Sequence, residues 1–287
     1  MSGPPSLTVV VPARNAARTI GEQLDALEAQ EYEGPWDVVV ADNGSTDGTA
    51  RVVEERVRRW PGLRLVSAAG RRGPAHARNV GVAGSDGALL LFCDADDVVR
   101  PGWVAAHALA LQDHALVAGA IDLRAFWPHV GAGYAGPMTR PPGAREWMAY
   151  AAGANLAVRR DVFAAAGGFD EDLRSGEDQD LSWRLQLAGH ELGFAAGAVV
   201  AKRDRTSFVG TWRQHFGYGR GSVLLYRKLA PLGMPRRDVR TVAGYVWFIG
   251  TKWWRAVQPG YRRLWAMTAA AQVGRVVGSV RYRTLYL

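Results

Sequence analysis

Residues 88–97 of this chain read ALLLFCDADD, and this stretch decides the kind of fold that the sequence predicts. Its first six residues are all apolar, which is typical of a strand buried on both faces in the middle of a parallel sheet. The four residues that follow, Asp94-Ala95-Asp96-Asp97, contain three acids. Because open sheets of this kind bind ligands beyond the carboxyl ends of their strands, these acids are the first candidates for a functional site.

Strands and helices alternate on the N-terminal side of this stretch. The runs LTVVV at 7–11, WDVVVA at 36–41 and, more weakly, residues 63–66 predict three further strands. Two helices between them are predicted by apolar residues at helical spacing, namely Ile20, Leu24 and Leu27 in one and Val53, Val57 and Trp60 in the other. The expected fold is therefore α/β, a Rossmann-like open and mostly parallel sheet with helices on both faces.

Motifs that the sequence lacks exclude several classes of protein. The residues after the first strand, Pro12-Ala13-Arg14-Asn15, carry no G-x-G-x-x-G, which argues against a dinucleotide-binding enzyme, and no P-loop motif occurs. The single cysteine, Cys93, excludes a disulfide framework and a cysteine-based zinc site. No apolar run reaches the roughly 18 residues of a membrane span, and residues 1–6 do not resemble a signal peptide. A cytoplasmic protein is therefore expected.

Charge is distributed unevenly along the chain. Of the 35 basic and 27 acidic residues, positions 201–287 hold 17 basic but only two acidic ones, which leaves 18 basic and 25 acidic residues for positions 1–200. We therefore expect a mildly acidic body over 1–200 and a basic C-terminal extension over 201–287, with different roles.

Two basic amphipathic helices are predicted in this extension, at about 242–257 and 261–283. Basic helices that also carry tryptophans suit the surface of an anionic membrane, and a homodimer interface is the alternative. Nucleic acid is not an expected partner, because no recognition motif accompanies the charge. The glycine-rich stretch 212–221 is interpreted either as a loop that closes over substrate or as an ordinary connection.

Asp94 and Asp96 are candidate metal ligands. At alternating positions of an extended chain their side chains point to the same side, where a cation would relieve the repulsion between two carboxylates. Carboxylate oxygens suit Mg²⁺ or Mn²⁺, which often share their coordination with phosphate groups. The alternative is a solvated acidic turn that binds nothing.

Two other acidic positions come directly after or at the start of predicted elements. Asp42, with Asn43, follows the second strand, where a carboxylate can accept from a ribose hydroxyl or a base N–H, and the alternative is an Asx-turn. Glu177 and Asp178 open a predicted helix, where acids are favoured at the first turn in any protein. A carboxylate held there also stays ionised and can serve as a general base.

Together these segments resemble the inverting family 2 glycosyltransferases, which have the GT-A fold. The similar stretches are VVVPARNAARTI (9–20), VVVADNGSTDGTA (38–50), GPAHARNVGVAGSDGALLLFCDADD (73–97), ANLAVRR (154–160) and GGFDEDLRSGEDQDLSWRLQLAG (167–189). They follow one another in the family's order. The resemblance implies a GT-A domain over 1–200, with a nucleotide-sugar-binding half at about 7–97 and an acceptor half at about 98–200.

The resemblance also implies a role for each matching residue. Asp96 and Asp94 of the D-x-D motif would bind the metal, and Asp178 would be the general base, with Glu177 orienting the acceptor or supporting Asp178. Contacts with the nucleotide-sugar are expected from Pro12, Arg14, Asn15, Asp42, Asn43, Arg78, Asp94 and Ala95.

Two positions depart from the family pattern. Many relatives carry two acids where this chain has Asp42-Asn43, so the donor base stays open among uridine, thymidine and guanosine. Many relatives also carry a histidine where this chain has residues 201–205. Either Asp204 takes its place, or Lys202 or Arg203 contacts the donor diphosphate directly. Arg220 is a further candidate for contact with diphosphate or acceptor.

The expected function is metal-dependent transfer of single sugars from a UDP-, dTDP- or GDP-sugar to a lipid-linked sugar or a growing cell-envelope polysaccharide. The protein would be cytoplasmic and peripheral on the inner face of the membrane. The alternative is a non-catalytic nucleotide-sugar-binding or scaffold protein on the same fold, and the presence of both acidic pairs argues against it. A nucleotidyltransferase is disfavoured because its glycine-rich basic loop after the first strand is absent.

Overall fold

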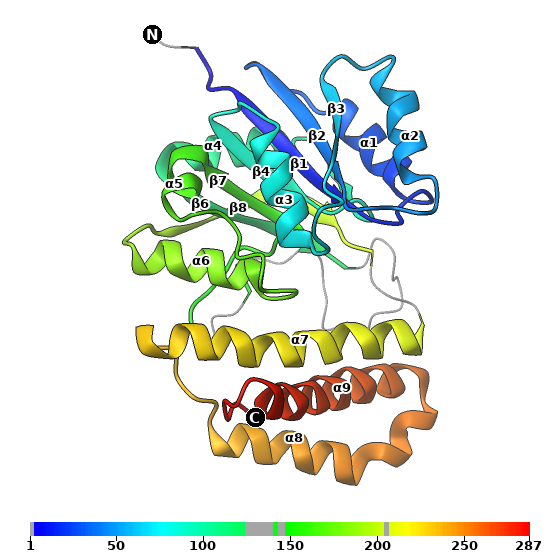
Figure 1. Cartoon of the computed structure of the whole chain (residues 1–287), viewed down its shortest axis with the longest axis vertical. Coiled ribbons are helices and arrows are strands. Elements are labelled where there is room, and N and C mark those ends of the chain that lie inside the picture. Colours follow the sequence, from blue (N-terminus) through cyan, green and yellow to red (C-terminus); the bar gives the residue numbers. More distant parts are fainter. Residues whose placement is uncertain (1–2, 124–139, 143–146, 204–206) are drawn as a thin grey trace. The chain divides into compact units, whose positions relative to one another are not determined.

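A computed structural model of the chain describes residues 3–123, 140–142, 147–203 and 207–287. The chain divides into two compact units (Figure 1). Unit 1 comprises residues 1–171 and 177–203 and is an α/β domain, and unit 2 comprises residues 172–176 and 204–287 and is helical. The chain passes from unit 1 to the C-terminal part of unit 2 after Arg203, and segment 172–176 belongs to the helical unit. The domain boundary expected after residue 200 stays a prediction.

Unit 1 is built on a mixed sheet whose described strands follow the order β3-β2-β1-β4-β7-β6-β8-β5. The strands are β1 (Leu7–Ala13), β2 (Trp36–Asp42), β3 (Leu63–Ser67), β4 (Leu89–Cys93), β5 (Val98–Val99), β6 (Leu116–Asp122), β7 (Asn155–Arg159) and β8 (Leu192–Ala201). The first four are parallel to one another, whereas β7 and β5 run antiparallel to their neighbours. The predicted open, mostly parallel sheet is confirmed.

Helices cover both faces of the sheet (Figure 1). They are α1 (Ile20–Glu28), α2 (Thr49–Val57), α3 (Pro74–Ala83), α4 (Trp103–Asp113), α5 (Arg160–Ala165) and α6 (Glu177–Leu187). Val9 and Val11 of β1 pack with α1, α2 and α4, while Val10 packs with α3, α5 and α6. Because both faces are covered, β1 is buried along its length except at the half-buried Pro12, and most of its residues are apolar.

The carboxyl ends of the central strands meet at one edge of the sheet. Ala13 at the end of β1 pairs with Asp42 at the end of β2, and β4 runs parallel to β1 and ends at Cys93. β8 runs parallel to β6 and ends at Ala201. Since β6 and β4 are both antiparallel to β7, the residues after β8 reach the same edge as those after β4. This carboxyl edge therefore collects the acids that the sequence singled out.

Unit 2 contains α7 (Phe208–Leu229), α8 (Val239–Lys252) and α9 (Pro259–Arg281), with short 3₁₀ turns at Ala230–Leu232 and Trp253–Val257. The two helices predicted in the extension correspond to α8 with its following turn and to α9. Among the described residues, no helix combines the length and apolar character needed to cross a bilayer.

The interpretation of residues 212–221 as a loop is wrong, because they lie inside α7. Glycines at 217, 219 and 221 lower helix propensity, but two of them allow other chain segments to approach the helix closely. A Cβ added to Gly219 would lie 1.9 Å from the backbone oxygen of Ala271 in α9. Gly274 of α9 faces Phe216 of α7 in the same way. The glycines thus serve helix packing rather than loop closure.

We predict opposite effects of alanine at two glycines of α7. Gly219→Ala should lower the melting temperature, because its methyl group would clash with the α9 backbone. Gly217→Ala is the matched control. Nothing lies within 4 Å of its added Cβ, so the higher helix propensity of alanine should raise the free energy of unfolding by up to about 1 kcal/mol. Thermal unfolding of both variants tests this, and equal stabilisation by the two would contradict the close packing of α7 on α9.

Candidate active site

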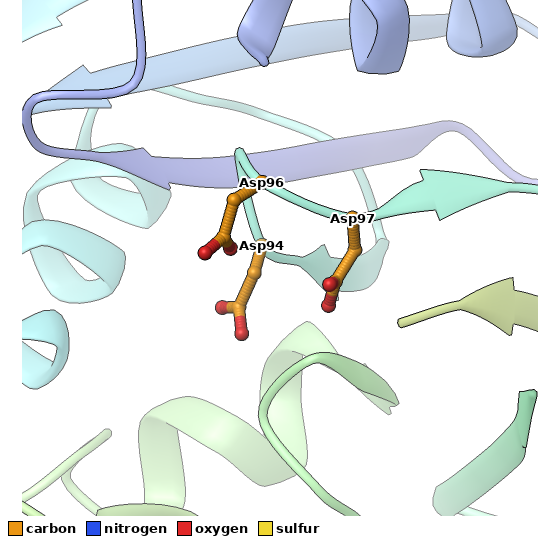
Figure 2. Close-up of side chains that lie close together, drawn as sticks. All are labelled: Asp94, Asp96 and Asp97. Atoms are coloured by element: carbon orange, nitrogen blue, oxygen red, sulfur yellow. The ribbon is translucent and has the colours of Figure 1, made fainter. Parts of the chain in front are cut away.

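Three aspartates follow β4 at the carboxyl edge. Figure 2 shows the side chains of Asp94, Asp96 and Asp97 with their carboxylates directed to the same side of the loop. One oxygen of each lies within 4.8 Å of the others, close enough for a shared cation. Asp97 is not among the metal ligands predicted from the sequence, and the structure adds it to the cluster. Its side chain is fully buried.

Lys202, directly after β8, lies among these carboxylates. Its Nζ is 3.1 Å from Oδ2 of Asp97 and 3.5 Å from Oδ2 of Asp94. Burial acts to lower the pKa of Lys202, but the two carboxylates outweigh it and raise that pKa, so the ammonium stays charged. Burial raises the pKa of Asp97, and the charge of Lys202 opposes this. The cation of Lys202 therefore balances part of the acidic cluster.

Arg203 fixes the same loop from the other side. Its backbone N–H donates to Oδ1 of Asp97 (2.8 Å), its Nε donates to the backbone oxygen of Asp96 (3.1 Å), and its guanidinium pairs with Glu22 of α1 (2.7 Å). Lys202 thus lies at the carboxylates and Arg203 braces their loop, while Asp204 lies outside the described residues. Contact of any of these residues with the donor diphosphate stays a prediction.

Arg78 of α3 connects the acidic cluster to the start of α6. Its two terminal nitrogens donate to Oδ1 of Asp94 (2.9 Å) and to Oε1 of Glu177 (2.7 Å), and the side chain is almost fully buried. Burial acts to lower the pKa of Arg78, but Asp94, Glu177 and Asp178 raise it. The pKa of Asp94 lies below its usual value. Burial acts to raise this pKa, but the positive charges of Lys202 and Arg78 outweigh the effect of burial.

Glu177 and Asp178 lie in different environments although they are adjacent. Glu177 is 6% exposed and is bound to Arg78, and burial together with Asp178 raises its pKa to about 7. Asp178 is half-buried and accepts backbone N–H bonds from Gly153 (2.9 Å) and Gln179 (2.9 Å). These bonds orient the Asp178 carboxylate and leave each oxygen a second lone pair for an incoming hydroxyl.

Gly153 was not predicted from the sequence. Its N–H holds Asp178, and a Cβ at this position would lie 2.8 Å from a guanidinium nitrogen of Arg78. The glycine therefore lets one backbone segment contact both the base candidate and the arginine. Its only signal in the sequence is its position just before the stretch ANLAVRR, which is too weak to identify it.

Asp42 and Asn43 are both engaged at the end of β2. The Asp42 carboxylate accepts from the backbone N–H and the hydroxyl of Ser45, three residues further on, so it orders the loop locally. The Asn43 amide donates to the backbone oxygens of Ala68 (2.6 Å) and Arg71 (2.7 Å) and accepts from the Gly73 N–H (2.9 Å). Asn43 thus shapes the loop before α3. Contacts of these two residues with a base stay predictions.

The remaining predicted donor contacts lie near the end of β1 or within the acidic loop. Asn15 has a positive φ of 51°, donates from its N–H to Ser45 and accepts from the Thr46 N–H (2.8 Å), which joins the β1 and β2 loops. Pro12 is half-buried, Arg14 is exposed, and Ala95 is buried between the aspartates. Arg220 lies on α7 in unit 2.

Comparisons with known proteins agree with this fold. The sequence model of the family described as Glycosyl transferase family 2 matches residues 8–126. Glycosyltransferase AglE from Haloferax volcanii is 27% identical over 231 residues, which are 77% of this chain and 74% of that protein. Succinoglycan biosynthesis protein ExoA from Rhizobium meliloti is 28% identical over 238 residues, 75% of this chain and 68% of that protein.

A solved structure shows the same architecture. The mannosyltransferase PcManGT from Pyrobaculum calidifontis, in complex with GDP-Man and Mn²⁺, has a TM-score of 0.69 at 22% sequence identity, covering 96% of this chain and 87% of its own. At this identity the likeness shows the GT-A fold. The sequence of residues 8–126 is thus that of a family 2 glycosyltransferase domain.

Proposed function

We propose that this chain moves a sugar from a nucleotide-sugar donor to an acceptor hydroxyl with inversion at the anomeric carbon and with a divalent metal. The observation that carries the proposal is the continuous set of contacts at the carboxyl edge. The aspartates after β4 are joined through Arg78 to the Glu177–Asp178 pair, so groups suited to the leaving diphosphate and to the acceptor proton lie in one unit.

The acidic cluster fits a hard divalent cation. Asp94, Asp96 and Asp97 together offer three carboxylates close to one another, the donor type that Mg²⁺ and Mn²⁺ prefer. Bound there, such an ion would neutralise the charge that develops on the diphosphate as the nucleotide leaves. Lys202 and Arg78 together hold the pKa of Asp94 below its usual value, and the ammonium of Lys202 also places a positive charge beside the cluster. The Mn²⁺ in the mannosyltransferase of similar fold supports this proposal.

Asp178 is the better general base of the adjacent pair. Glu177 is buried and tied to Arg78, so it cannot reach a substrate hydroxyl. Asp178 is partly exposed and held by two backbone N–H groups. It would take the proton from the acceptor hydroxyl as that oxygen attacks the anomeric carbon from the face opposite the nucleotide. Glu177 acts as a positioning residue through Arg78.

The metal proposal is tested by Asp96→Ala. The variant should lose metal-dependent binding of nucleotide-sugars and keep its fold, because Asp96 lies in a loop after β4 and outside the core. Thermal shifts with UDP-, dTDP- and GDP-sugars, each with and without Mn²⁺, measure this and also identify the donor base. Asp113→Ala, an exposed acid at the end of α4, is the control. A wild-type response to metal and nucleotide in Asp96→Ala would refute the assignment.

The proposed base is tested by Asp178→Asn. Turnover should fall by about 10²–10⁴-fold, because the amide cannot accept the proton, while donor binding should persist. Steady-state kinetics and donor thermal shifts measure the two effects separately. Glu177→Gln serves as the comparison and should reduce turnover less than Asp178→Asn. If Asp178→Asn turns over at nearly the wild-type rate, the base lies elsewhere.

We further propose that the acceptor is a lipid-linked or envelope glycan and that the C-terminal helices α8 and α9 contact an anionic membrane. Within the described chain α8 has no buried side chain, and Trp247 and Trp253 are 59% and 63% exposed. Lys252 lies over the Trp247 ring at 4.9 Å, and Arg255 lies over the Trp254 ring at 5.2 Å. Exposed tryptophans next to basic groups suit the headgroup region of anionic lipids. The similarity to ExoA, a succinoglycan biosynthesis protein, supports a glycan acceptor.

Vesicle sedimentation tests the membrane proposal. The protein should pellet with anionic vesicles far more than with neutral ones, because each nearby Lys or Arg contributes about 1 kcal/mol at an anionic surface. Reversing the charge at Arg262, Arg263 and Arg275 should weaken pelleting. Reversal at Arg51, Arg58 and Arg59, on or just after α2 of unit 1, is the matched control and should leave it unchanged. If the chain ignores anionic vesicles and sediments as a dimer, the extension is an oligomerisation element.

A further inference from the structure

Unit 2 encloses a cavity of about 500 Å³ that the proposed reaction chemistry does not use. It is lined by residues 172–175, by α7 from Arg213 to Leu224, and by the end of α9 at Arg281 and Tyr282. These three segments are far apart in the sequence, and each contributes at least one arginine. They are Arg174, Arg213, Arg220 and Arg281.

The cavity carries a strong positive charge. Guanidinium groups stay protonated in proteins, and among the described residues none of these four arginines forms an ion pair. Asp172 is the one acid among the residues that line the cavity. Four like charges around one space repel one another unless an anion enters, so the arrangement favours an anionic ligand.

The segments around the cavity are held in place by contacts within unit 2. The hydroxyl of Ser175 donates to the backbone oxygen of Gly217 (3.0 Å). Gly221 allows this approach, because a Cβ there would lie 2.1 Å from the Ser175 hydroxyl. Gly219 and Gly274 allow the similarly close contact of α7 with α9. The arginines are therefore presented by packed backbone segments, which lowers the entropy cost of ordering them around a ligand.

The arginine side chains that line the cavity indicate which kind of anion it would bind. Planar guanidinium groups bind phosphate oxygens in bidentate fashion, and several of them together match the charge of a diphosphate better than that of a single carboxylate. Gln214 and Tyr218, which bond to each other at 2.9 Å, add neutral polar groups to the wall. A space of about 500 Å³ is also in the range of small-ligand sites and exceeds the volume of one phosphate.

We propose that this cavity binds a phosphate or diphosphate group carried by the acceptor, an assignment that rests on the proposed function. In the proposed function the acidic cluster, with a divalent ion bound there, would take the donor diphosphate, so the cavity is left for another group. Segment 172–176 continues directly into Glu177 and Asp178, with Gly176 in a positive-φ conformation at the junction. An acceptor phosphate held by Arg174 is thus bound by the chain segment that leads into the general base.

Isothermal titration with inorganic pyrophosphate in EDTA tests the site, since without metal the acidic cluster does not bind a diphosphate. Wild-type protein should bind, and Arg213→Gln/Arg281→Gln should weaken binding roughly tenfold or more, because two charge-assisted contacts are lost. Both arginines are exposed, so the fold should survive, which thermal unfolding verifies. Arg51→Gln/Arg240→Gln removes the same charge outside the cavity and should bind like wild type. Absent binding in wild type, or equal loss in both double variants, overturns the proposal.

The donor site is read out separately in the same variants. Arg213→Gln/Arg281→Gln should keep its thermal shift with nucleotide-sugar and Mn²⁺. If wild-type protein shows no such shift with any donor, the proposed function fails while the pyrophosphate result still reports on the cavity. If donors bind normally but pyrophosphate does not distinguish the two double variants, the cavity proposal alone fails.

Competition distinguishes the sources of the phosphate. Displacement of pyrophosphate by a prenyl diphosphate in neutral vesicles, but not by glucose 1-phosphate in solution, supports a lipid-linked acceptor. The reverse pattern supports a soluble phosphorylated acceptor. Failure of both to compete would overturn the assignment of the cavity to the acceptor.

Discussion

Charge balance at the carboxyl edge of the sheet is the constraint on which the rest of unit 1 depends. Carboxylates from the loop after β4 and from the start of α6 are brought together there, and buried carboxylates at such distances require compensating cations. Arg78 supplies one by bridging Asp94 and Glu177, and Lys202 supplies another between Asp94 and Asp97. The edge is thus ordered by ion pairs between segments that are distant in the sequence.

This balance separates the roles of groups that the sequence presents as equivalent. Glu177 and Asp178 are neighbours in the sequence, but the buried Glu177 carboxylate is bound to Arg78. Asp178 is partly exposed, and its carboxylate is oriented by two backbone N–H groups. The same holds after β2, where the amide of Asn43 is used to hold the following loop. The role of each polar side chain at this edge therefore depends on its burial and its hydrogen-bond partners, and the residue type alone does not determine it.

Unit 2 differs from unit 1 in its charge and in the way its helices pack. Four arginines and one acid, Asp172, line its cavity, and α7 and α9 approach closely at glycines in addition to packing buried apolar side chains such as Val223 and Leu229. Close backbone packing fixes α7 against α9 and leaves long basic side chains to surround a cavity. In the proposed function, the exposed tryptophans of α8 and of the turn after it, Trp247, Trp253 and Trp254, contact a lipid surface.

Local patterns were sufficient for most of the fold. Unbroken apolar runs, helical spacing and the position of acids after strands are properties of neighbouring residues, so the sequence by itself determined the four parallel strands, the helices on both faces and the grouping of acids at one edge. The antiparallel strands β5 and β7, the helix at 212–221 and the contributions of Asp97 and Gly153 were decided only by tertiary structure. In each case the deciding contact joins distant segments: Gly219 is tolerated in α7 because α9 packs on it, and Asp97 enters the cluster because Lys202 and Arg203 arrive from β8. The periodicity of the sequence does not indicate which distant segments come into contact.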